Sequence, residues 1–367
     1  MPGCSLVKEI LNLLAALKSP APRVLATLGK VEGSSYRRAG ARLLWSPNSA
    51  RVGSISGGCL EDDLIERARG VLASGTPQTV VYDTTGENDL VWGVGLGCHG
   101  VVTVLLETVR QPAAQWLLLE EAWKARRPVS FVTVISAPSA EWLGTWMAYA
   151  DADNLTTRGP ELPGLERLAA QCLLSETSRT VAIDTPRGRA EVFCEYLPCP
   201  LSLTVFGAGD DAKPLVRLAK ELGWQIRVAD PRPAYAKPER FPEADEVRAI
   251  AAEDAANLSW DSRCVAVAMT HHYRYDTPIL RAMLPLGLPY LGLLGPKKRA
   301  ERILDDLAGQ GIRPTSEMLA RFHAPVGLDL GGNSPEEVAY SILAEIQTVL
   351  NRRDGRPLRE RTQPIHG

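Results

Sequence analysis

The sequence predicts an α/β protein of two domains, an amino-terminal α/β domain and a carboxy-terminal domain built on a parallel sheet. Its 367 residues exceed what one hydrophobic core usually fills. Its 45% hydrophobic and 23% charged residues are typical of globular chains rather than disordered ones. At LPCPLS (197–202) two prolines interrupt the pattern, and strands and helices then alternate regularly. These observations predict domains over 1–196 and 202–350, followed by a polar, mobile tail over 351–367.

The first domain begins with an amphipathic helix over about residues 5–18, because Leu6, Ile10, Leu14 and Leu17 recur at helical spacing. Extended apolar segments then flank glycine-containing loops, a pattern typical of strands joined by functional loops. Between about 140 and 196 the periodicity is weak, so only short strands are expected there. The further elements that we predict are strands within 23–33, 41–45, 51–56, 79–85, 99–107, 128–137, 180–184 and 190–197, and helices over about 60–74 and 115–127.

The second domain begins with a strand, a glycine turn, a helix and a second strand that ends at Asp230. The theme repeats in CVAVAMTHH (264–272), a helix from about residue 276 and YLGLLG (290–295), and this alternation predicts a parallel sheet. The last helix follows Ser334. We expect this serine to cap the helix, with Pro335 in the first helical position and Glu337 closing a capping box.

The glycine turn GAGDDA (207–212) matches the Rossmann dinucleotide pattern, because it follows an apolar strand and opens a helix. In that interpretation Gly207 permits the tight turn, Gly209 leaves room for a phosphate, and Asp230 binds a ribose diol. Two carboxylates at 210 and 211 would face the pyrophosphate, and Arg232 follows the acidic residue, so NAD(P) is possible but not favoured. Acids at helix starts are also ordinary capping residues. The alternative is a dinucleotide fold that binds another ligand or only scaffolds the protein.

Two cysteines lie in glycine-rich loops of the first domain. Cys59 follows Gly57 and Gly58 at the start of a helix, where the helix dipole favours the thiolate, a nucleophile and soft metal ligand. Cys98 follows Gly97 in a second such loop, so the two thiols are predicted to share one site. The competing interpretation is that both are small buried residues. The other cysteines form no CxxC pair, so we expect neither a zinc site nor disulfides.

The loop GSSYRRAG (33–40) offers hydroxyl groups together with Arg37 and Arg38, which suit a phosphate or a polar heterocycle. Two arginines in a hairpin turn can equally be solvated. Three acids, at positions 61 to 63, lie in the first turn of the following helix, where the dipole alone can explain them.

Charge and hydropathy exclude several classes of protein. The formal net charge is −2, which indicates no nucleic-acid partner. The longest apolar runs fall far short of the ~18 residues of a membrane helix. The chain starts with an amphipathic segment rather than a secretory signal, so a soluble cytoplasmic protein is expected.

Several motifs together resemble the xanthine dehydrogenase accessory factor family, the XdhC/CoxI proteins. The resemblance implies a two-domain protein, often dimeric, that is not an enzyme. It implies a chaperone that binds the molybdenum cofactor and protects it while a cysteine desulfurase supplies a sulfur ligand. The cofactor then passes to xanthine dehydrogenase or a related molybdenum hydroxylase. The motifs are VEGSSYRRAGARLLW (31–45), GSISGGCLED (53–62), GLGCHGVVTVLLE (95–107), VFGAGDDAKPLVRLA (205–219), MTHHYRYDTPIL (269–280), YLGLLGPKKRAERI (290–303) and VGLDLGGNSPEEVAYSILAEI (326–346).

The resemblance gives the candidate residues specific roles. The cargo is molybdopterin or its cytosine dinucleotide. Cys59 and Cys98 are possible molybdenum ligands, or Cys59 briefly holds a persulfide, and the two arginines contact anionic groups. The turn departs from the GAGH of many relatives. His271 and Asp276 follow a strand at the edge where parallel sheets bind ligands, although a structural role for that histidine is slightly favoured.

Two alternatives to the chaperone stay open. An NAD(P)-dependent oxidoreductase is supported by the glycine turn, but no paired general acid and carbonyl-binding group accompanies it. The second alternative is a nucleotide-sensing or scaffold protein in which the glycine loops are structural.

Overall fold

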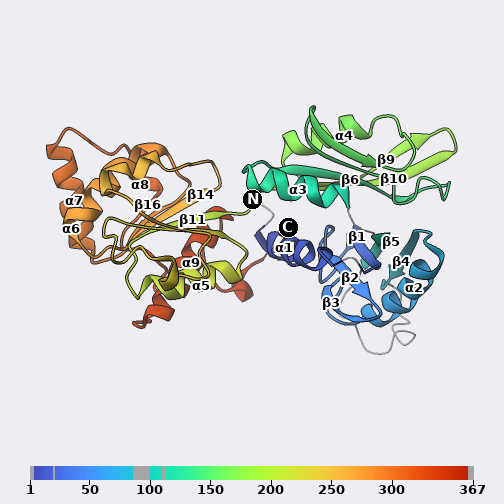
Figure 1. Ribbon diagram of the computed structural model, residues 1–367, viewed down its shortest axis with the longest axis horizontal. Helices are drawn as coiled ribbons and strands as arrows, with labels where there is room; N and C mark the ends of the chain where they lie inside the picture. The colour runs from blue at the N-terminus through green and yellow to red at the C-terminus, as the bar shows by residue number, and fades with distance from the viewer. Residues whose placement is uncertain (1–3, 20, 86–99, 110–112, 363–367) are drawn as a thin grey trace. The chain divides into compact units, whose positions relative to one another are not determined.

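The chain folds into two compact units, Ser5–Cys199 and a second unit that begins at Pro200. The computed structural model describes residues 4–19, 21–85, 100–109 and 113–362, and Figure 1 shows both units. The division lies inside the LPCPLS segment. The prediction of a mixed α/β protein with a parallel carboxy-terminal sheet is confirmed.

The first unit contains two five-stranded antiparallel sheets, in the orders β3-β2-β1-β5-β4 and β8-β7-β6-β10-β9. The sequence analysis did not indicate β7, β8 or the helix α4, and of these β8 is largely exposed and carries no apolar alternation. The elements are α1 (Cys4–Leu17), β1 (Arg23–Gly33), β2 (Arg42–Ser46), β3 (Ser49–Gly53), α2 (Glu61–Ser74), β4 (Gln78–Asp83), β5 (Gly100–Val109), α3 (Ala114–Lys124), β6 (Val129–Ser136), β7 (Trp146–Asp151), β8 (Asn154–Arg158), α4 (Leu165–Ser175), β9 (Arg179–Thr185) and β10 (Gly188–Leu197).

Helix α2 packs on the first sheet through a stripe of buried side chains. Leu64, Ala68 and Val71 repeat at helical spacing and join the core formed by β1, β2 and β5. Apolar burial of this kind contributes about 25 cal/mol per Å². The helix start, and the loop before it, are thereby fixed relative to the sheet.

A buried ion pair joins the two sheets of the first unit. Arg42 of β2 binds both carboxylate oxygens of Glu195 of β10, with Nη1 to Oε1 at 2.9 Å, and both side chains are almost fully buried. We expect Glu195→Ala to lower the free energy of unfolding of this unit by about 3 kcal/mol or more, because the guanidinium stays buried without its counter-ion.

Denaturant unfolding followed by hydrogen exchange of β2 peptides measures this effect. The matched control is Glu191→Ala, which breaks the half-exposed pair with Lys30 and should cost at most about 1 kcal/mol. If both variants lost the same free energy of unfolding, the buried pair would not be the more stabilising one.

The second unit is a doubly wound parallel sheet in the order β13-β12-β11-β14-β15-β16. Helices α5 and α9 pack on one face and α6 and α7 on the other, as Figure 1 shows. The elements are β11 (Ser202–Phe206), α5 (Ala212–Glu221), β12 (Gln225–Asp230), η2 (Pro238–Arg240), β13 (Glu246–Ala249), η3 (Ala252–Asn257), β14 (Cys264–Ala268), α6 (Tyr273–Met283), η4 (Leu284–Leu286), β15 (Leu291–Leu293), α7 (Lys297–Gly309), α8 (Ser316–Ala320), β16 (Phe322–His323), α9 (Pro335–Leu350) and η5 (Leu358–Glu360).

The predicted start of the last helix is confirmed in full. Ser334 accepts a hydrogen bond from the Glu337 amide, and the Glu337 side chain accepts one from the Ser334 amide. Helix α6, in contrast, starts at Tyr273 and not at 276. The described part of the last segment, 351–362, carries one short helical turn.

Candidate functional site

A buried carboxylate shapes the loop that carries Cys59. Oε1 of Glu61 accepts hydrogen bonds from the Ser54 hydroxyl at 2.7 Å and from the amides of Ile55 and Ser56 at 3.1 and 2.9 Å. The Ser56 hydroxyl donates to Oε2. The same hydroxyl accepts hydrogen bonds from the amides of Gly58, at 3.3 Å, and Leu60, at 3.1 Å. One side chain therefore organises the whole loop before α2.

These hydrogen bonds also control the charge of Glu61. Burial by itself would raise the pKa of the carboxyl group, but the donors of Ser56 and Ser54 outweigh it and lower the pKa from 4.5 to about 2. The sequence suggested only a dipole effect for this acid. The SISGG segment before it carries the hydroxyls that could have indicated more.

Cys59 is exposed and lies two residues before the first residue of α2. Of the cysteines whose side chains the structure describes as exposed or buried, Cys59 alone is exposed. Gly58 has φ of +120°, a backbone conformation that favours glycine, and Gly57 lies against the Tyr36 ring. The other four such cysteines, Cys172, Cys194, Cys199 and Cys264, are buried.

A pocket beside Cys59 brings four segments of the first unit together. It lies between the loop after β1, the loop before α2, the end of β4 and the start of β5. Gly100 is required there, because an added Cβ would lie 2.5 Å from the Ser34 carbonyl oxygen. The pocket is lined by Ser34, Ser35, Tyr36, Ile55, Ser56, Cys59, Leu60, Thr84, Gly100 and Val102.

The second predicted cysteine loop lies outside the described residues. This holds for both Gly97 and Cys98, so their place in a common site stays a prediction. Gly100, two positions along the chain from that cysteine, does line the pocket of Cys59.

The two arginines of the first loop differ in their surroundings. Arg37 forms an ion pair with Glu9 of α1 and is partly buried, so it anchors the loop to the first helix. Arg38 is exposed, and its carbonyl accepts a hydrogen bond from the Ala41 amide. Contact with an anionic group stays a prediction for both arginines.

Internal contacts explain both glycines of the Rossmann turn. A Cβ on Gly207, which has φ of +122°, would lie 2.5 Å from the Met269 carbonyl oxygen. A Cβ on Gly209 would lie 2.5 Å from Oδ1 of Asp211. The space that was expected to admit a phosphate at Gly209 is thus filled by a carboxylate of the same turn.

The predicted ribose contact of Asp230 is not supported by this conformation. The side chain is fully buried, and its oxygens accept hydrogen bonds from the Ala208 amide at 2.7 Å and from the Arg232 amide at 2.8 Å. The Arg232 guanidinium binds both oxygens as well. Burial would raise the pKa of Asp230, but these donors lower it. The residue therefore fixes the glycine turn to the end of β12.

His271 lies at the carboxyl end of β14 and pairs with the turn. Its Nε2 is 2.6 Å from Oδ2 of Asp211, and its backbone has φ of +60°, which is uncommon for a residue with a side chain. Asp276 is fully buried and binds Thr270 and Arg299. The sequence had not indicated these last two residues. Within the described part of the chain, no three His, Cys, Asp or Glu side chains gather as a metal site.

Comparison with known proteins places the chain in a family. Residues 203–346 match the model of the XdhC Rossmann domain, and residues 16–83 match that of the XdhC and CoxI family. A Bacillus subtilis (strain 168) protein, named as a probable xanthine dehydrogenase subunit, is 32% identical over 337 residues, 90% of this chain and 94% of that protein. The chain belongs to the XdhC and CoxI family.

Two further relatives extend over most of this XdhC and CoxI family member. The Escherichia coli (strain K12) molybdenum cofactor insertion chaperone PaoD is 24% identical over 334 residues, 91% of this chain and 85% of PaoD. A Bacillus halodurans crystal structure, described as a xanthine dehydrogenase, superimposes with a TM-score of 0.76 at 31% identity, covering 96% of this chain and 98% of that one. Among the described residues, no helix is long and apolar enough to cross a membrane.

Proposed function

We propose that this protein binds the molybdenum cofactor and delivers it to a molybdenum hydroxylase of the xanthine dehydrogenase type. The observation that carries the proposal is the exposed Cys59 on a loop that buried Glu61 holds in place. Cysteine sulfur is a soft metal ligand, and a preorganised loop loses little entropy on binding. The name of PaoD, a molybdenum cofactor insertion chaperone, supports the same role.

The cofactor is the cargo of this protein and not a resident group. Its dithiolene sulfurs already hold the metal, so one protein thiolate suffices as an additional ligand. Ser34 and Ser35 line the same pocket, and their hydroxyls suit polar groups of the cargo. Arg38 supplies positive charge for a phosphate close to this loop.

The resemblance supports finer steps as part of the proposal. A cysteine desulfurase supplies the terminal sulfur while the cofactor is bound, and the chain acts as a cytoplasmic homodimer that catalyses no reaction itself. Both molybdopterin and its cytosine dinucleotide are candidate forms of the cargo. The NAD(P)-dependent oxidoreductase alternative loses support, because Asp230 is buried and Asp211 fills the space over Gly209.

Transfer to an apo-enzyme tests the delivery step. The full chain is loaded with cofactor released from a donor enzyme, separated from unbound cofactor by gel filtration, and mixed with apo-xanthine dehydrogenase. We expect enzyme activity to be restored even when excess unrelated cofactor-binding protein traps free cofactor, since the cargo passes directly. If the trap protein reduced the recovered enzyme activity equally for the loaded chain and for free cofactor, direct delivery would be contradicted.

A further inference from the structure

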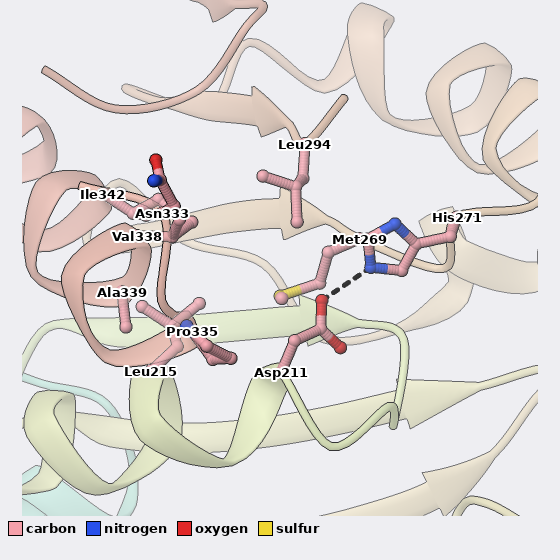
Figure 2. Close-up of a pocket in the computed structure, with 10 residues that line it drawn as sticks. All are labelled: Asp211, Leu215, Met269, His271, Leu294, Asn333, Pro335, Val338, Ala339 and Ile342. Atoms are coloured by element: carbon pink, nitrogen blue, oxygen red, sulfur yellow. Dashed lines mark hydrogen bonds and ion pairs between the residues drawn. The ribbon is translucent and has the colours of Figure 1, made fainter. Parts of the chain in front are cut away.

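A pocket of about 230 Å³ in the second unit takes no part in the proposed function. It lies at the carboxyl edge of the sheet, between the start of α5, the ends of β14 and β15, and the first turns of α9 (Figure 2). At ~30 Å³ for each water molecule, it has room for a bicyclic ring. Its lining residues are Asp211, Leu215, Met269, His271, Leu294, Asn333, Pro335, Val338, Ala339 and Ile342.

The lining of this pocket suits a flat ring with a polar edge. Aliphatic side chains and Met269 form most of its walls, which favours contact with the faces of a planar group. The carboxylate of Asp211 and the ring of His271 lie together on one side in Figure 2. No lysine or arginine is among the described residues that line it, so the pocket itself offers no counter-ion for a phosphate.

Helix capping does not explain the place of Asp211. The residue occupies the N-cap position of α5, yet its side chain makes no capping hydrogen bond. The carboxylate turns instead toward His271. Its neighbour Asp210 faces solvent and pairs with Lys213 at 2.7 Å and with Arg240 at 3.1 Å, so only the second acid of the turn belongs to the pocket.

A buried network holds His271 in its left-handed conformation. The Thr270 hydroxyl donates to Asp276 at 2.6 Å, and the His272 amide donates to that hydroxyl at 3.1 Å. Arg299 pairs with the other oxygen of Asp276. Backbone strain that the surrounding structure enforces beside a cavity is typical of ligand sites.

We propose that this pocket binds an uncharged planar heterocycle through an edge of N–H donors, the 2-amino-4-oxo-pyrimidine edge shared by guanine and pterins. A carboxylate accepts hydrogen bonds from the ring N–H and the amino group of that edge, and aliphatic walls cover the ring faces. Because carboxylates occupy the turn where a dinucleotide would place its pyrophosphate, the ring enters the pocket and any phosphate stays outside. Recognition of guanine does not depend on the proposed function, whereas recognition of a pterin rests on it, because molybdopterin carries that ring.

Binding of four probes to the full chain tests this inference. Guanosine, 6-hydroxymethylpterin, adenosine and NADH are titrated by calorimetry. We expect guanosine or the pterin to bind and adenosine and NADH to bind at least about tenfold more weakly, the ratio that loss of a charge-assisted hydrogen bond produces. The tighter of the first two identifies the source of the heterocycle, and similar affinities indicate recognition of the shared edge. Binding of neither, or tighter binding of NADH, would overturn the proposal.

Two variants locate the site. Asp211→Asn should weaken binding at least about tenfold, whereas Asp210→Asn, which changes the exposed neighbour, should leave it within about twofold. His271→Gly relieves the unfavourable φ, so the variant should unfold at an equal or higher temperature and yet bind more weakly. If His271 were purely structural, the His271→Gly variant would bind with unchanged affinity. Unaltered binding by Asp211→Asn would refute the site. Cys59→Ala should not change guanosine binding, because that residue lies in the first unit. The variant therefore distinguishes loss of ligand binding in this pocket from loss of cofactor binding at Cys59.

Discussion

The Cys59→Ala variant is expected to bind the molybdenum cofactor at least about tenfold more weakly than the parent chain. The exposed thiol is the one soft ligand that the described part of the pocket offers, and its loss leaves only hydroxyl and backbone contacts there. A tenfold change corresponds to about 1.4 kcal/mol, a modest estimate for a metal–thiolate bond. The measurement is retention of cofactor on gel filtration, quantified by pterin fluorescence after oxidation.

Two controls show whether the thiolate itself is responsible. Cys59→Ser preserves the shape of the side chain and should be nearly as impaired as the alanine variant, because a hydroxyl is a hard and weakly acidic ligand. Ser74→Ala, an exposed change at the far end of α2, should have no effect. Normal retention by Cys59→Ser would assign the residue a packing role instead.

Replacement of Glu61 by glutamine should destabilise the first unit by about 3 kcal/mol at neutral pH. The pKa of this carboxyl falls from 4.5 to about 2 in the folded chain, and each pKa unit corresponds to about 1.4 kcal/mol. Because the folded value is the lower one, the stabilisation is complete above pH ~5 and is lost as the pH falls toward 2. At pH 3 less than half of the difference between the parent and Glu61→Gln should remain.

Urea unfolding of both full-length proteins at pH 7 and pH 3 measures this difference, with hydrogen exchange of α2 peptides reporting the first unit separately. The control is Asp62→Asn, the exposed neighbour in the same helical turn, for which we expect a loss below about 1 kcal/mol. A difference that is the same at both pH values would show that Glu61 does not stabilise the loop through its charge. Equal losses for Glu61→Gln and Asp62→Asn would indicate a dipole effect alone.

Local patterns predict the central strands and the last helix of the second unit, although they did not indicate β13, α7, α8 or β16. The alternation of strands and helices predicts its parallel sheet, and the Ser-Pro-Glu-Glu start predicts the capping box of α9, because both depend on residues close together in sequence. The segment after residue 140 is not predictable in detail. Strand β7 pairs with β6, and the largely exposed β8 pairs with β7, so both belong to a second antiparallel sheet and β8 has no buried apolar run of its own.

The candidate sites show the same limit of sequence reasoning. The glycine turn is recognisable, but its usual function depends on what fills the space over Gly209, and here the Asp211 side chain fills it from within the protein. Asp230 likewise ends the expected strand, yet both of its carboxylate oxygens accept hydrogen bonds from the Arg232 guanidinium. The Cys59 loop is predictable because a thiol after two glycines is a local signal. The role of Glu61 depends on which groups fold back onto it.

Equilibrium binding of the molybdenum cofactor to the purified full chain tests the central claim most directly. Cofactor released from a donor enzyme is titrated and read by pterin fluorescence after oxidation, with NAD(H) and NADP(H) titrated in parallel. We predict saturable, near-stoichiometric binding of the cofactor that Cys59→Ala weakens, and no comparable binding of the nicotinamides. Absence of cofactor binding together with micromolar binding of a nicotinamide would contradict the account and favour the oxidoreductase.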